Sequence, residues 1–158
     1  MGDAMKFVFC EGKDDVAVLR SLASHLKLDV QVEEYGGKSN LANFLRTLST
    51  RPEFVRQQVV AMAVLRDADA DAAATFTSVR DTLLQNNFAA PDADGTFKEA
   101  APRVGVFIVG VNGRGMIEDL SRVAGYKSRI SNWLGFSVCW NLNSVSVNSS
   151  CKDVFSKG

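Results

Sequence analysis

The sequence has little of what several common catalytic and metal-binding sites need. Its 158 residues include only three cysteines and one histidine. Cys10, Cys139 and Cys151 form no Cys-x-x-Cys pair and lack the spacing typical of a zinc site. The histidine, His25, lies in an amphipathic helical pattern. We therefore expect neither a zinc site nor catalysis by a serine–histidine or cysteine–histidine pair.

An excess of basic residues and a long apolar run are also missing. The 18 basic residues balance 18 acidic ones. Proteins that bind nucleic acid through bulk electrostatics are usually basic, so any contact with DNA or RNA has to be local or has to use metal ions that screen phosphate. No apolar run approaches the roughly 20 residues that span a bilayer, and the first residues do not resemble a secretory signal. We expect a cytoplasmic protein with no membrane contact.

Apolar residues make up 46% of the chain, an ordinary value for a globular domain. Strand and helix patterns alternate four times in its first three-quarters. The expected strands are 6–10, 30–35, 59–65 and 104–111, and the helices that follow them begin at Asp14, after Gly37, near Ala73 and near Met116. Strands separated by such helices pair in parallel with right-handed crossovers. The sequence thus predicts a three-layer α/β/α sandwich with a mainly parallel, Rossmann-like sheet of about four strands.

Two segments depart from this alternation. The stretch 89–103 holds two prolines, a glycine and several charges, which predicts a long surface loop. We expect one domain over residues 1–125 and a C-terminal extension over 126–158. The extension could be an edge strand, a dimer arm or a tail, and its apolar residues from Trp133 to Trp140 would suit a homodimer contact.

Charged residues and glycines gather where the expected strands end. The four ends carry Glu11-Gly12-Lys13, Gly36-Gly37-Lys38, Arg66-Asp67-Ala68-Asp69-Ala70-Asp71 and Asn112-Gly113-Arg114-Gly115. Ligands of open α/β sheets bind at the carboxyl ends of the strands. For Glu11 to reach the acidic residues after strand three, strands one and three must be neighbours. That requirement predicts the strand order two-one-three-four.

The acidic residues suit a divalent metal. Mg²⁺ prefers carboxylate oxygens, waters and substrate phosphate as ligands. Asp67 and Asp69 could hold Mg²⁺ or Mn²⁺ once the chain leaves the regular pleat. Basic side chains around the metal could contact phosphate oxygens: these are Lys38, Arg66 and Arg114, together with Lys13 beside Glu11.

Two of these motifs resemble a known domain. The stretch Val8-Phe9-Cys10-Glu11-Gly12-Lys13-Asp14-Asp15, followed after a third strand by Leu65-Arg66-Asp67-Ala68-Asp69, is similar to the toprim domain. That domain occurs in topoisomerases, bacterial primases, a small ribosomal-RNA-maturing ribonuclease and the overcoming-lysogenization-defect nucleases. Its pattern is Glu-Gly after strand one and Asp-x-Asp after strand three. The resemblance covers roughly residues 5–120 and extends to small stand-alone toprim-like proteins.

The resemblance implies a role for each matching residue. Glu11 would be a general acid/base or a metal ligand, with Lys13 beside it as a catalytic candidate. Asp67 and Asp69 would hold Mg²⁺, which stabilises charge on a phosphoryl group, and Asp71 could add a further ligand. Glu118 or Asp119 could add a carboxylate in the manner of the nuclease branch. The chain lacks the glycine that often follows the Asp-x-Asp motif. It also lacks tyrosine-nucleophile and zinc modules, so topoisomerase or complete primase activity is not expected.

Simpler interpretations of the same residues remain open. The acids at 67–71 could cap the third helix, and Asp14 and Asp15 could cap the first. The lysines could be ordinary surface residues. An EF-hand is excluded because Ala72 and Ser78 stand where its glycine and glutamate are needed. The sequence predicts a Mg²⁺-dependent, nuclease-like domain acting on DNA or RNA. The alternative is a non-catalytic toprim-like module that binds a phosphorylated ligand or a partner protein.

Overall fold

A twisted sheet lies at the centre of the protein. The structure, a computed structural model, describes residues 4–25 and 27–110. Within them the sheet has five strands in the order β2-β1-β3-β5-β4. The strands are β1 (Met5–Cys10), β2 (Gln31–Glu34), β3 (Val59–Asp67), β4 (Thr96–Lys98) and β5 (Arg103–Val109). The pairs β1–β2, β1–β3 and β3–β5 are parallel, whereas β4 pairs with β5 antiparallel.

The predicted sheet is therefore right in its α/β class and wrong in its strand count and order. The error lies in the stretch 89–103, which was expected to be loop and instead contains β4. Phe97 of β4 packs edge-on against Phe107 of β5, with ring centroids 5.6 Å apart. The amide of Gly95 donates to the carbonyl oxygen of Val106, with an N–O distance of 2.9 Å. These contacts hold β4 against the edge of the sheet. With three residues, β4 is too short to show an alternating pattern in the sequence.

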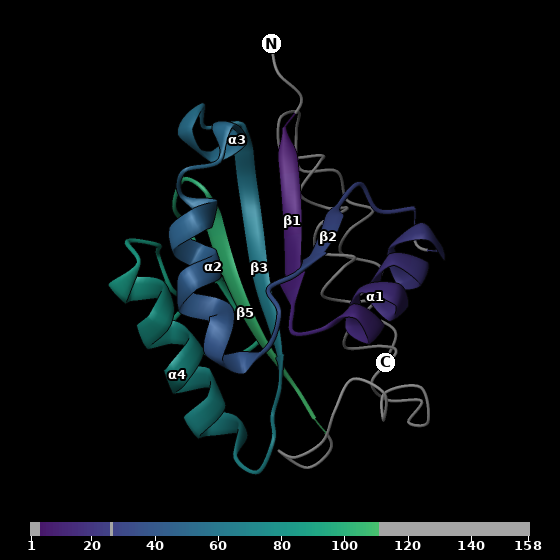
Figure 1. Cartoon of the computed structure of the whole chain (residues 1–158), viewed down its shortest axis with the longest axis vertical. Coiled ribbons are helices and arrows are strands. Elements are labelled where there is room, and N and C mark those ends of the chain that lie inside the picture. The colour runs from purple at the N-terminus through teal and green to yellow at the C-terminus, as the bar shows by residue number, and fades with distance from the viewer. Residues whose placement is uncertain (1–3, 26, 111–158) are drawn as a thin grey trace, which may run out of the picture.

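Helices cover both faces of the sheet, which gives three layers (Figure 1). One face carries α1 (Lys13–His25), and the other carries α2 (Leu41–Leu48) and α4 (Ala72–Gln85). A short 3-10 turn, η1 (Lys38–Asn40), leads into α2. Pro52 is the first residue of the short helix α3 (Pro52–Val55). Proline suits the first turn of a helix, where its missing N–H is not needed.

Each face of the sheet has its own apolar core. Phe7, Phe9, Met62, Val64 and Val106 point toward α2 and α4, whereas their strand neighbours point toward α1. The inner face of α2 consists of Leu41, Leu45 and Leu48, which are all buried. No helix in the described ranges is both long and apolar enough to cross a membrane.

The register between the two central strands slips once. The irregularity falls between Met5 and Lys6, at the amino end of β1. From Lys6–Ala61 to Phe9–Val64 the pairing is continuous. The carboxyl ends of β1 and β3, which carry the predicted site residues, therefore lie side by side in fixed register. The predicted fourth helix near Met116 and the extension 126–158 lie outside the described residues.

Candidate functional site

The turn after β1 is held by backbone bonds and by one buried acid. The amide of Gly37 donates to the carbonyl oxygen of Glu11, and the amide of Tyr35 donates to that of Cys10, each at 2.9 Å. Asp15, only 6% exposed, accepts a hydrogen bond from the amide of Gly12 at 3.0 Å. A side chain near the third helical residue that reaches back to the residue before the helix is half of a capping box. Asp15 thus helps to cap the start of α1, in agreement with the capping interpretation.

Glu11 carries a partly buried carboxylate. Its Oε2 atom is buried and has no hydrogen-bond partner among the described residues. Burial raises the pKa of Glu11 from 4.5, and the positive charges of Lys38 and Arg66 oppose this while Asp69 adds to it. A buried oxygen without a hydrogen-bond partner destabilises the fold, because it loses its hydrogen bonds to water and forms none in the protein. The atom is suited to take a proton, a cation or a ligand donor.

Two further groups lie close enough to Glu11 to interact electrostatically. Arg66, the next-to-last residue of β3, has a buried Nε with no hydrogen-bond partner in the part of the chain the structure describes. Tyr35 is 1% exposed, and its hydroxyl donates to the carbonyl oxygen of Leu65 at 3.4 Å. Burial and then the Glu11 charge raise the pKa of Tyr35 above 10, while Arg66 lowers it. Tyr35 was not predicted to have a role, although its position before Gly36 at a strand end was a usable signal.

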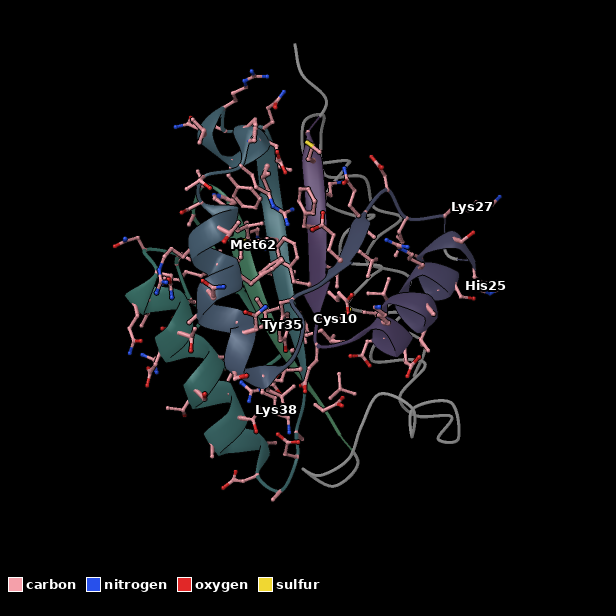
Figure 2. All side chains as sticks on the ribbon, in the orientation of Figure 1. Cys10, His25, Lys27, Tyr35, Lys38 and Met62 are labelled. Atoms are coloured by element: carbon pink, nitrogen blue, oxygen red, sulfur yellow. The ribbon has the colours of Figure 1, made fainter. Side chains whose placement is uncertain are left out.

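Lys38 and Asp69 form an ion pair between two loops of this edge. Lys38 follows β2 and Asp69 follows β3, so their contact crosses the end of β1, which lies between those strands. Figure 2 shows Lys38 beyond Tyr35 and Cys10, at the carboxyl end of the sheet. The two side chains are 44% and 31% exposed. Lys38, predicted to bind phosphate, is here paired with a predicted metal ligand.

The other two acids after β3 differ from Asp69. Asp71 is the N-cap of α4, where its carboxylate accepts from the amide of Ala74 at 3.0 Å. The capping interpretation is confirmed for this residue. Asp67 is the last residue of β3 and pairs with Val109, so the regular pleat extends through it. Alternation then places Asp67 on the face of Leu65 and α1, and Arg66 on the opposite face.

Of the remaining predicted residues, the structure describes only Lys13. Lys13 is exposed at the first residue of α1. Arg114, Glu118 and Asp119 lie outside the described residues.

Within residues 4–25 and 27–110, no three histidine, cysteine or acidic side chains are arranged to hold a metal ion. Mg²⁺ often needs only one or two protein carboxylates, with water and substrate phosphate completing its shell. The partnerless Oε2 of Glu11 and the carboxylate of Asp69 fit that smaller requirement.

The fold and this edge define an α/β protein whose charged residues converge at the carboxyl ends of its parallel strands. The chain belongs to the family of proteins of unknown function DUF3226, whose model matches residues 5–130. The match therefore includes β1, every residue of the described cluster and β5. No curated protein and no solved structure matches the chain.

Proposed function

We propose that the carboxyl edge around Glu11 is a Mg²⁺-dependent phosphodiester-processing site of toprim type, nuclease-like and acting on nucleic acid. The observation that carries this proposal is the buried carboxylate oxygen of Glu11, which lies close to Arg66, Lys38 and Asp69 and accepts no hydrogen bond from residues 4–25 and 27–110. Paired carboxylates with nearby basic side chains suit phosphate chemistry, since the acids can hold a metal and the cations can hold phosphate oxygens.

Each of these residues would have a separate role in the reaction. Burial raises the pKa of Glu11, which favours a role as a general acid/base. Arg66 offers a buried guanidinium nitrogen that a phosphate oxygen could accept from. Asp69, with Asp67 beside it in sequence, would hold Mg²⁺, which supplies stabilisation of charge on the phosphoryl group.

The test is metal binding followed by cleavage. Calorimetric titration with Mg²⁺ and Mn²⁺ should show binding by the wild type and its loss in Asp67→Asn and Asp69→Asn. Asp92→Asn is the matched control, because Asp92 is an exposed acid before β4 and forms an ion pair with Lys98. DNA and RNA substrates should be cut only with metal present, and Glu11→Gln should abolish cutting. Unchanged metal binding in both aspartate variants would remove the site assignment.

A second candidate function is a non-catalytic toprim-like module that binds a phosphorylated ligand or a partner protein, which could be a second copy of the chain. The ion pair between Lys38 and Asp69 favours it, because a carboxylate already neutralised by lysine has less need of a metal. Such a module binds phosphorylated ligands with or without metal and cuts nothing. Cleavage by the wild type that is lost in Glu11→Gln rules it out.

A further inference from the structure

We propose that Lys38 is a built-in cation that occupies the Asp69 carboxylate until a divalent metal displaces it, so that metal binding frees the Lys38 ammonium group. This inference rests on the proposed metal site and concerns how that site is regulated. The metal and Lys38 then compete for one carboxylate, and Lys38 is a positioning residue rather than a metal ligand.

The position of the ion pair in the sheet supports this competition. Lys38 lies after β2 and Asp69 after β3, with β1 between them. Neighbouring strands lie about 4.7–4.9 Å apart, so the two loops are separated by roughly 10 Å of sheet. A lysine stem is long enough to cover most of that gap. The pair therefore lies over the end of β1, close to the Glu11 oxygen that has no hydrogen-bond partner in the described part of the chain.

Both loops are held in place by their own backbone bonds. Gly36 and Gly37 have φ angles of 81° and 96° and turn the chain back from β2. The Asn40 side chain donates to the carbonyl oxygen of Tyr35 at 2.5 Å. On the other side, the amide of Ala68 donates to Val109 at 2.7 Å and precedes Asp69, which has a φ of 51°. The ion pair thus joins two loops that do not need it to keep their shape.

Charge and exposure favour exchange. The positive charge of Lys38 reaches Glu11 and opposes the rise in the pKa of that residue. Both partners of the pair are partly exposed, and ion pairs of this kind are weak. A divalent ion offers Asp69 twice the charge and can also coordinate the Oε2 atom of Glu11, to which no described residue donates. Once displaced, the Lys38 ammonium has three N–H donors for a phosphate oxygen close to the metal.

The experiment measures Mn²⁺ affinity directly, from the electron paramagnetic resonance signal of free Mn²⁺, at about 0.15 M salt so that distant charges are screened. Lys38→Met keeps the length of the side chain and removes its charge. Loss of the competing ion pair should tighten Mn²⁺ binding roughly two- to five-fold. Lys38→Arg keeps the charge and should stay near the wild-type affinity. Lys98→Met is the matched control, because it breaks the exposed Lys98–Asp92 ion pair on β4.

The outcomes separate this inference from the proposed function. Tighter binding in Lys38→Met alone supports competition, and a purely structural lysine would weaken binding instead. If the wild type binds Mn²⁺ and Lys38→Met binds it equally or more weakly, the competition is overturned and the metal site stands. If neither protein binds Mn²⁺, the metal site fails and the competition fails with it.

Discussion

The backbone amide of Gly37 donates a hydrogen bond to the carbonyl oxygen of Glu11, with an N–O distance of 2.9 Å. This bond joins the loop after β2 to the first residue after β1. Lys38 follows Gly37 directly, so the bond fixes the backbone of an acid and a base of the same edge. The frame of the candidate site is therefore part of the fold and does not depend on a ligand.

Replacing Gly37 should be costly. Its φ of 96° and ψ of 160° lie in a region that essentially only glycine adopts. Gly37→Ala should lower the free energy of unfolding by about 1–3 kcal/mol, measured by urea denaturation. Gly12→Ala is the control, because the added carbon would meet only Asp15 Oδ2, at 4.0 Å. A loss in Gly37→Ala no larger than that in Gly12→Ala would contradict the strain argument.

Glu11→Gln should change stability in a way that depends on pH. Burial raises the pKa of Glu11 above its ordinary 4.5, so the folded wild type binds its proton more tightly than the unfolded chain does. That stabilisation is fully present below pH 4.5 and is lost as the pH rises through the folded pKa. Glutamine stays neutral at every pH. The variant should match the wild type near pH 4 and be the more stable protein near pH 7.5, as measured by thermal melting.

A constant difference in melting temperature between the two proteins across that range would refute the raised pKa. Glu34→Gln, on the neighbouring strand β2, serves as the control for the removal of one acidic charge.

Asp71 should matter for the stability of α4 and not for metal binding. Its carboxylate caps the helix through the amide of Ala74. Asp71→Ala should cost about 1 kcal/mol, within the usual range of 0.5–2 for a lost cap. Asp71→Ser should restore most of the loss, because serine is also a good N-cap. Weaker Mn²⁺ binding in the serine variant would show that Asp71 is a ligand after all.

Gly105 should be the residue that permits β4 to pair with the sheet. A Cβ atom at this position would lie 2.6 Å from Cε1 of Phe97 and 2.9 Å from Cε2 of Phe107. Gly105→Ala should therefore destabilise the protein by about 1–3 kcal/mol through overpacking. Combined with Phe97→Ala, the same change should cost clearly less, because the main obstacle is gone. Additive losses in the double-mutant cycle would show that the two positions are independent.

The long, strongly patterned elements were predictable from sequence because one face or both faces of each are buried. The apolar run at 59–65 lies within β3, and the stripe of Leu41, Leu45 and Leu48 is the inner face of α2. The short elements were not. β4 has three residues and α3 has four, too few for either the strand or the helix period to appear. Both depend on tertiary contacts that a linear pattern does not contain.

The candidate site shows the same division. The positions of Glu11 and Asp69 followed from strand ends, and parallel pairing of β1 with β3 brought their loops to one edge. The interaction partners of these charged residues could not be predicted from the sequence. Sequence could not show that Lys38 would pair with Asp69 or that Tyr35 would lie beside Glu11, since both depend on how the loop after β2 turns. Nor could it choose between capping and metal binding for Asp71, because one carboxylate suits both.

Because the register between β1 and β3 slips between Met5 and Lys6, the two ends of β1 should differ in how well they accept insertions and deletions. A residue added or lost before Lys6 can be absorbed where the pairing is already irregular. A residue inserted between Lys6 and Phe9 would fall where the pairing with β3 is continuous and could not be absorbed. It would turn Phe9 to the opposite face and move Glu11 along the strand by about 3.3 Å. Length variation among related chains should therefore collect at the amino end of β1, while the distance from Phe7 to Glu11 stays constant.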